Sequence, residues 1–140
     1  MRQYSIAERS LRKNEWKPKG LAPLSHDLTG KTLAILGMGG IGIRIAQLAR
    51  AFPMRVIYHN RRPNADAPEW CEYVPKVEDM LAQADVLSVS VPLNANTVGL
   101  VGEKYIRALK KGSIIVNTAR GKVIDEDAMI RALEDGHVSL

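Results

Sequence analysis

Glycines at positions 37, 39 and 42 have the spacing of a phosphate-binding turn. They lie in Gly37-Met38-Gly39-Gly40-Ile41-Gly42, directly after the apolar run 33–36 and before a segment with helical spacing. In such a turn the first glycine allows the sharp change of direction, the second lets the backbone approach a pyrophosphate, and the third lets helix and strand pack closely. The start of the helix would offer N–H groups to the phosphates. The pattern predicts a dinucleotide site, although packing alone also produces glycine-rich turns.

A second candidate site follows the next apolar run, 55–59. Dinucleotide sites of this type place an acidic residue against the adenosine ribose about 20 positions past the glycines. Here the position holds the neutral Asn60, followed by Arg61 and Arg62. Guanidinium groups suit a phosphate by charge and by geometry. The sequence therefore favours NADP, or tolerance of both NADP and NAD; the alternative is that both arginines only face solvent. His59 is expected to be a packing or edge residue.

Arg120 follows a third apolar run, 113–117, and precedes Gly121. Ligands of open parallel sheets bind beyond the carboxyl ends of the strands. An arginine at that edge can hold a carboxylate through two parallel hydrogen bonds and polarise an adjacent carbonyl. We expect Arg120 to face the cleft near the nicotinamide, although an arginine in isolation after a strand is more often a surface residue.

The composition describes one globular domain with few special features. The 140 residues are 46% hydrophobic and 25% charged, and Cys71 is the only cysteine. A single cysteine excludes an internal disulfide and a Cys-built metal cluster, so we expect no metal site and a reducing, cytoplasmic location. No apolar run reaches the roughly 18 residues of a membrane helix, and the N-terminus does not resemble a secretory signal.

The positive charge is concentrated at one end of the chain. The formal net charge is +5, of which +4 lies in residues 1–20. The remaining residues are nearly neutral, whereas a nucleic-acid surface needs basic groups spread over the fold. We therefore expect no nucleic-acid partner and a small-molecule ligand instead.

Apolar strands and amphipathic helices alternate along the chain, which predicts an α/β fold with a doubly wound, mostly parallel sheet. Residues 1–30 are expected to form a helix and an arm rich in Pro and Gly, and residues 31–140 a partial dinucleotide-binding domain. Strands are expected at 31–36, 55–59, 72–75, 85–91 and 113–117, and helices at 4–14, 40–52, from 77, 103–110 and 125–135.

Three motifs in order resemble the D-isomer-specific 2-hydroxyacid dehydrogenases. They are 36–42 (the glycine turn), Val91-Pro92-Leu93-Asn94 with Thr97, and 116–121 followed by Asp125-Glu126. The resemblance covers about residues 4 to 140. Within the family, the 58–62 segment looks most like the glyoxylate/hydroxypyruvate reductase branch.

The resemblance implies a two-domain, homodimeric oxidoreductase. It would have a Rossmann-type sheet and reduce a 2-keto acid to a D-2-hydroxy acid by hydride transfer from NADPH or NADH. Residues 1–30 resemble the family's interdomain and dimer-contact segment. Arg120 matches the family's substrate-binding catalytic arginine. The family's cofactor contacts fall on Gly37, Gly39, Gly40, Ile41, Gly42, Asn60, Arg61, Arg62, Val91, Pro92, Thr97, Thr118, Ala119 and Arg120.

The chain also departs from the family pattern. Family members carry part of their catalytic domain before residue 1, and their general-acid histidine and its glutamate partner follow position 140. None of His26, His59 and His137 occupies the matching place. We therefore expect a sheet that is incomplete at the C-terminus and little turnover by these residues alone. Two alternatives stay open: a non-catalytic dinucleotide-binding module, and a truncated chain that does not fold alone.

Overall fold

The computed structural model describes residues 4–15 and 27–139. Its centre is a five-stranded sheet in the order β3-β2-β1-β4-β5, and every neighbouring pair of strands is parallel. The doubly wound α/β fold expected from the sequence is confirmed. The strands are β1 (Thr32–Leu36), β2 (Arg55–His59), β3 (Glu72–Tyr73), β4 (Val86–Val89) and β5 (Ile114–Asn117).

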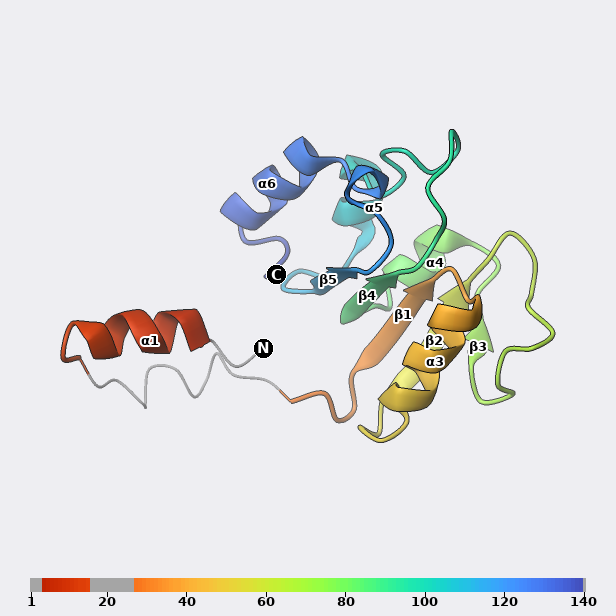
Figure 1. Cartoon of the computed structure of the whole chain (residues 1–140), viewed down its shortest axis with the longest axis horizontal. Coiled ribbons are helices and arrows are strands. Elements are labelled where there is room, and N and C mark those ends of the chain that lie inside the picture. Colours follow the sequence, from red (N-terminus) through yellow and green to blue (C-terminus); the bar gives the residue numbers. More distant parts are fainter. Residues whose placement is uncertain (1–3, 16–26, 140) are drawn as a thin grey trace.

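Helices follow most of the strands, as Figure 1 shows. The helix after β1 ends at Ala49 rather than at the expected Phe52, because the backbone turns before Pro53 and a residue preceding proline disfavours helical geometry. A short 3-10 helix after β5 has no counterpart in the predicted elements. The helices are α1 (Tyr4–Arg12), α3 (Gly40–Ala49), α4 (Val77–Leu81), α5 (Glu103–Ala108), η2 (Gly121–Val123) and α6 (Glu126–Glu134).

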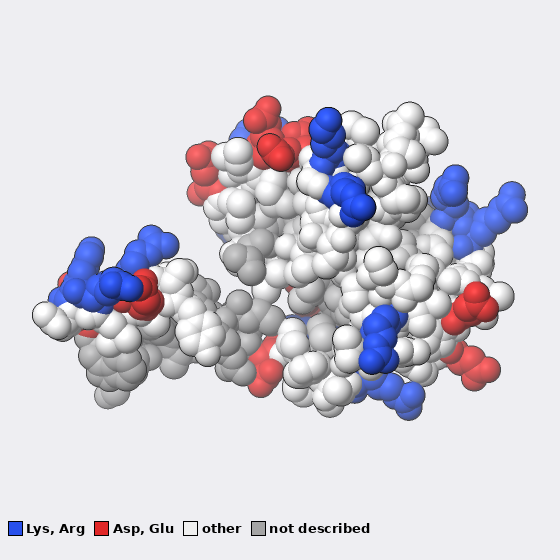
Figure 2. Space-filling model, viewed as in Figure 1, with Lys and Arg blue, Asp and Glu red and all other residues white. Residues whose placement is uncertain are grey.

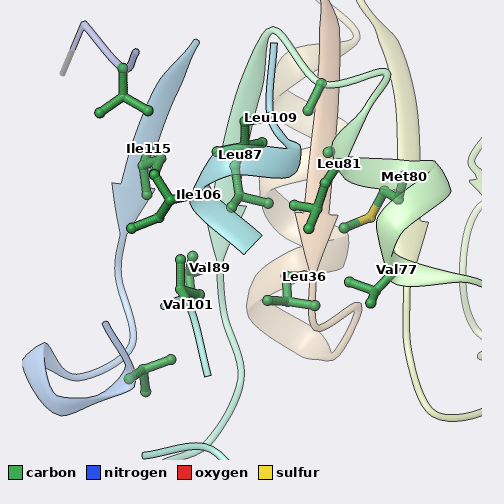
Figure 3. Close-up of a cluster of buried hydrophobic side chains, with 14 of the residues drawn as sticks. Leu36, Val77, Met80, Leu81, Leu87, Val89, Val101, Ile106, Leu109 and Ile115 are labelled. Carbon is green, nitrogen blue, oxygen red and sulfur yellow. The ribbon is translucent and has the colours of Figure 1, made fainter. Parts of the chain in front are cut away.

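The two faces of the sheet are covered by different helices. Alternate residues of β1 show the division, since Leu33 and Ile35 pack with Ala46 of α3, whereas Ala34 and Leu36 pack on the opposite face. That opposite face carries the larger apolar cluster, to which α4, α5 and α6 contribute buried residues. Figure 3 shows the residues of α4 and α5 against the sheet. Side chains that alternate between two buried faces explain why the strands read as continuous apolar runs.

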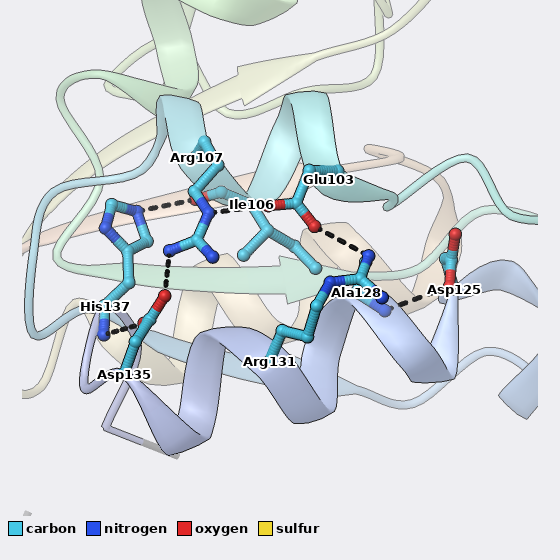
Figure 4. Close-up of polar contacts among 8 residues, drawn as sticks. All are labelled: Glu103, Ile106, Arg107, Asp125, Ala128, Arg131, Asp135 and His137. Carbon is cyan, nitrogen blue, oxygen red and sulfur yellow. Dashed lines mark hydrogen bonds and ion pairs between the residues drawn. The ribbon is translucent and has the colours of Figure 1, made fainter.

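Polar contacts fasten α5 to α6, as Figure 4 shows. Glu103 of α5 accepts hydrogen bonds from Arg107, at 2.7 Å, and from Arg131 of α6, at 2.9 Å. Arg107 also pairs with Asp135, at 2.7 Å. As predicted, Asp125 caps α6, because its carboxylate accepts a hydrogen bond from the Ala128 N–H at 3.1 Å.

The N-terminal helix α1 forms as the sequence predicted, but none of its residues is buried. Figure 1 shows it apart from the sheet, and Figure 2 shows basic side chains gathered over it. Most of the predicted arm, residues 16–26, lies outside the described residues. Within the described ranges, no helix has the length and apolar character needed to cross a membrane.

Candidate dinucleotide-binding site

The turn between β1 and α3 is held tightly at two of its glycines. Gly37 has a φ of +101°, and a Cβ atom there would lie 2.8 Å from the carbonyl carbon of Ser90, just after β4. A Cβ atom on Gly42 would lie 2.5 Å from the carbonyl oxygen of Gly37. Both positions therefore require glycine for the backbone to turn and for α3 to pack close to the end of β1.

The middle of the same turn is open. A Cβ atom on Gly39 or Gly40 would meet nothing within 4 Å. Gly39 is the N-cap of α3 and provides no side chain to cap the helix. The first N–H groups of an α-helix have no partner within the helix, and they carry the positive end of its dipole. Bare backbone of this kind fits the diphosphate of a dinucleotide.

A cavity of about 870 Å³ lies beside this turn, at the carboxyl ends of β1, β2 and β4. This volume lies within the usual range for small-molecule sites. The strand order reverses at β1, and open α/β sheets bind ligands at such a reversal. The lining residues are Leu36, Gly37, Met38, Gly39, His59, Asn60, Arg61, Arg62, Ser90, Val91, Pro92, Asn94, Asn96, Thr97, Leu100 and Tyr105.

The cavity brings together many, but not all, of the residues predicted from the sequence. Gly37, Gly39, Asn60 and the two arginines line it, and so do Val91, Pro92 and Thr97. Two predicted groups lie outside the lining: the helix-start residues Gly40, Ile41 and Gly42, and the residues after β5, Thr118, Ala119 and Arg120.

The residues after β2 have two distinct environments. The side-chain amide of Asn60 faces the glycine turn, where its Oδ1 accepts a hydrogen bond from the Met38 N–H at 2.7 Å. Arg61 and Arg62 are exposed at the cavity. Within residues 4–15 and 27–139, neither arginine forms an ion pair, so both lie at the cavity without an acidic partner among those residues.

His59 lies at the end of β2, where its imidazole packs on Tyr73 with the ring centroids 6.4 Å apart. Its Nδ1 lies 2.9 Å from the carbonyl oxygen of Val74. A carbonyl only accepts hydrogen bonds, so Nδ1 carries the proton. His59 is therefore a packing residue at the carboxyl end of β2, and it also lines the cavity.

The loop after β4 is stabilised by Thr97. Its Oγ1 donates a hydrogen bond to the carbonyl oxygen of Pro92, at 2.6 Å, and accepts one from the Asn94 N–H, at 2.8 Å. These contacts give the loop a fixed shape over the cavity. A direct contact between Thr97 and a cofactor stays a prediction.

The turn after β5 presents Arg120 on the surface. Asn117 shapes this turn, since its side chain accepts a hydrogen bond from the Ala119 N–H at 3.0 Å and donates one to the Arg120 carbonyl at 2.9 Å. The guanidinium of Arg120 is exposed and donates to the Ala119 carbonyl at 2.8 Å. It lies beyond the carboxyl end of β5, as expected, and outside the cavity lining.

Sequence reasoning did not single out Asn64, Ser90 or Tyr105. The Asn64 side chain donates a hydrogen bond to the Met38 carbonyl at 2.7 Å, and only its place in a polar, proline-containing loop hinted at a role. The backbone of Ser90 closes the cavity beside Gly37. Burial, and then the charge of Glu78, raise the pKa of Tyr105, so its phenol stays protonated at neutral pH.

Comparisons with known proteins agree with this geometry. The model of the D-isomer specific 2-hydroxyacid dehydrogenase NAD binding domain matches residues 1–140. A crystal structure of a glyoxylate reductase from Paecilomyes thermophila is 47% identical, with a TM-score of 0.86 over 99% of this chain and 42% of that one.

Two further relatives are named for other substrates. The 4-methyl-2-oxopentanoate reductase A of Aspergillus oryzae is 43% identical over 99% of this chain and 41% of its own length. A formate dehydrogenase from Staphylococcus aureus, solved in complex with NAD, is 28% identical, with a TM-score of 0.88 over 98% of this chain and 41% of that one. The chain thus spans about two fifths of the relatives it matches. With its parallel sheet, its glycine turn and this family match, the chain belongs to the D-isomer-specific 2-hydroxyacid dehydrogenases and carries their NAD-binding domain.

Proposed function

We propose that this chain is the cofactor-binding part of a reductase that converts a 2-keto acid of the glyoxylate or hydroxypyruvate type to a D-2-hydroxy acid. The cavity beside the open glycine turn carries this proposal, because it joins bare backbone for a diphosphate to the exposed Arg61 and Arg62. The 47% identity to a glyoxylate reductase supports the substrate class. A longer keto acid is the second candidate, which the similarity to a 4-methyl-2-oxopentanoate reductase favours.

The residues around the cavity fit a nicotinamide dinucleotide. The backbone from Gly39 to Ile41 would hold the diphosphate, and the loop of Val91, Pro92 and Thr97 would lie over the cofactor. Thr118, Ala119 and Arg120 would contact its nicotinamide half, beyond the end of β5. The bound cofactor supplies the hydride. These side chains and N–H groups bind it and orient its reactive face toward the keto acid.

NADPH is the cofactor that the residues after β2 favour. Asn60 brings no negative charge that would repel a 2′-phosphate, and the exposed Arg61 and Arg62 can pair with that phosphate in bidentate fashion. NADH stays the alternative cofactor, because a neutral residue at this position does not exclude a free 2′-hydroxyl.

Arg120 is the residue of this chain assigned to the chemical step. Its guanidinium would bind the carboxylate of the keto acid and stabilise the negative charge that develops on the carbonyl oxygen. The proposal assigns the general acid, a histidine paired with a carboxylate, to a part of the protein beyond these residues. It also includes a homodimer, with residues 1–30 at the contact between domains and subunits, and a cytoplasmic location, which the single thiol Cys71 supports.

Titration of the chain with NADPH and NADH tests the binding claim. We expect saturable binding of both nucleotides, with NADPH bound more tightly, when nucleotide fluorescence or calorimetry is followed. ADP-ribose and 2′-phospho-ADP-ribose provide the control, because they contain the diphosphate and lack the nicotinamide. A chain that is folded by circular dichroism and binds none of these compounds would remove the proposed function.

A measurement of turnover distinguishes the proposed enzyme from the alternative of a non-catalytic dinucleotide-binding module. We expect these 140 residues with glyoxylate and NADPH to consume almost no cofactor, because general acid catalysis contributes about 10²–10⁴-fold. A longer protein that continues past Leu140 with a glutamate and a later histidine should consume NADPH with glyoxylate or hydroxypyruvate. A longer protein that binds NADPH but reduces no 2-keto acid would favour the binding module.

A further inference from the structure

The backbone of Met38 is held by two asparagine side chains from another part of the chain. The Met38 N–H donates to Oδ1 of Asn60 at 2.7 Å, and the Met38 carbonyl accepts from Nδ2 of Asn60 at 3.1 Å. Nδ2 of Asn64 donates to the same carbonyl at 2.7 Å. Both amide orientations are fixed by these partners, because an N–H must meet an acceptor and a carbonyl must meet a donor.

Both asparagines are themselves held in place. The hydroxyl of Tyr73 donates to the Asn60 carbonyl at 3.2 Å, and the Asn64 N–H donates to the hydroxyl of Tyr58 at 3.3 Å. Oδ1 of Asn64 accepts a hydrogen bond from the Asp66 N–H at 3.0 Å. The backbones of the two residues are therefore bonded to side chains of β2 and β3, and the Asn64 side chain is also bonded to its own loop. These contacts restrict the positions from which both amides reach the glycine turn.

The turn needs such support because Met38 stands between two glycines. Glycine loses more conformational freedom on ordering than any other residue, so a turn with Gly37, Gly39 and Gly40 is intrinsically flexible. Met38 is the one side chain in this stretch, and it is 1% exposed. Its buried side chain fixes one side of the residue, and the two asparagine amides fix its backbone.

We propose that Asn60 and Asn64 form an amide clamp, whose function is to hold the glycine turn in its diphosphate-binding shape. In this inference, which rests on the proposed dinucleotide binding, both are positioning residues. Because the Met38 contacts orient both ends of the Asn60 amide toward the turn, this inference assigns Asn60 to positioning the turn instead of reading the ribose. Discrimination between the two cofactors falls to the neighbouring Arg61 and Arg62.

The clamp and direct ribose recognition predict opposite results for Asn60→Asp. Aspartate keeps an acceptor for the Met38 N–H but replaces the donor with a carboxylate oxygen, which would lie close to the Met38 carbonyl oxygen. The clamp predicts that this variant weakens the binding of NADPH and of NADH. Direct recognition predicts tighter NADH binding, because a carboxylate accepts hydrogen bonds from the ribose hydroxyls.

Asn64→Ala isolates the second arm of the clamp. Losing one hydrogen bond of this kind changes an equilibrium by about three- to tenfold. We expect both Kd values to rise by about that factor, with their ratio unchanged. Amide hydrogen exchange in residues 37–40 should become faster in the unliganded chain. Asn64→Asp keeps the acceptor for the Asp66 N–H and serves as a second variant, should the alanine variant fold poorly.

Two control variants complete the experiment. Gln47→Ala removes an amide from the exposed face of α3, and it should change neither affinity nor exchange in the turn. Ala65→Asp adds a carboxylate to the same loop as Asn64 and measures the effect of charge alone for comparison with Asn60→Asp. Unchanged affinities and unchanged exchange in Asn64→Ala, or tighter NADH binding in Asn60→Asp, would overturn the clamp. Failure of the unmodified chain to bind nucleotides would instead contradict the proposed function, while the exchange measurement would still test the clamp.

Discussion

The glycines of the turn after β1 have separable functions, and each can be tested by adding one methyl group. Gly39 has an extended backbone that any residue adopts, and the space around its missing Cβ is open. Gly42 has no such space, since its Cβ would collide with the Gly37 carbonyl oxygen. The missing side chain of Gly39 therefore leaves space for a ligand, whereas that of Gly42 allows α3 to pack against the turn.

We expect Gly39→Ala to retain the thermal stability of the chain and to weaken dinucleotide binding by at least about tenfold, because the methyl group would enter the space of the diphosphate. Gly42→Ala should lower the free energy of unfolding by about 1–3 kcal/mol, the usual effect of overpacking. Thermal melts and nucleotide titrations of the two variants distinguish these effects. Equal loss of stability in both would contradict the assignment.

Arg61 and Arg62 provide the test of cofactor preference. Reversing both charges, in Arg61→Glu with Arg62→Glu, should weaken NADPH binding by more than about tenfold, because a hydrogen bond to a charged group contributes about 1.5–3 kcal/mol. NADH binding should change little. Lys111→Glu, an exposed residue outside the cavity lining, is the matched control. An unchanged ratio of the two affinities in the double variant would remove the phosphate assignment.

The sequence predicted many of the residues that line the cavity but not the contacts among them. The glycine spacing and the two arginines could be recognised in the sequence, because each motif consists of residues that are close together along the chain. The bonds from Asn60 and Asn64 to Met38 cross more than 20 residues. They depend on how two loops meet at the sheet edge, which no local pattern encodes. For the same reason the hydrogen bonds from Asn60 to the glycine turn were not expected, and its contact with the ribose stays a prediction.

At the scale of elements, periodicity predicted nearly every helix and strand. β2 has the predicted bounds, 55–59, because a short apolar run between polar residues leaves little choice. The 3-10 helix Gly121–Val123 was missed, since three residues carry no periodic signal. Helix ends were less well predicted than strand positions, because the last turn depends on tertiary contacts such as those between α5 and α6.

The polar contacts between α5 and α6 predict a specific pH dependence. Hydrogen bonds from Arg107 and then Arg131 lower the pKa of the Glu103 carboxyl. Because this pKa is lower in the folded state than in the unfolded chain, the stabilisation is present above the ordinary carboxyl pKa of about 4.3. It is lost as the pH falls through the lowered value. Thermal melts should show the midpoint falling over that acid range, and less steeply in Glu103→Gln. Glu134→Gln, an exposed position on α6, should keep the steep fall.

At the scale of the whole molecule, an apolar cluster packs on each face of the sheet. The cavity lies at the carboxyl ends of the strands, where the strand order reverses. The sequence predicted the parallel sheet and a cavity at the carboxyl ends of its strands, because both follow from strand–helix alternation. It did not predict which helices share a face. The union of α4, α5 and α6 over one face arises from packing between distant segments.

The reactivity of the Cys71 thiol tests whether the chain folds by itself. Burial raises the pKa of its thiol to about 11, and the residue is 8% exposed. At neutral pH the residue is therefore a shielded thiol and a poor nucleophile. We expect iodoacetamide to alkylate it slowly in buffer and rapidly in denaturant. Equal rates under both conditions would support the alternative that these residues do not fold without further chain.

The outer edge of β5 has a practical consequence for handling the protein. Just before this strand, Ser113 forms a parallel bridge with Val138, and the Ser139 N–H donates to the Ser113 carbonyl at 2.9 Å. Beyond this point, within the described part of the chain, Ile114–Asn117 pairs with β4 alone. An open strand margin is a template for intermolecular pairing. Concentrated samples of these residues should therefore self-associate through β5, and a lysine in place of the exposed Val116 should keep them dispersed.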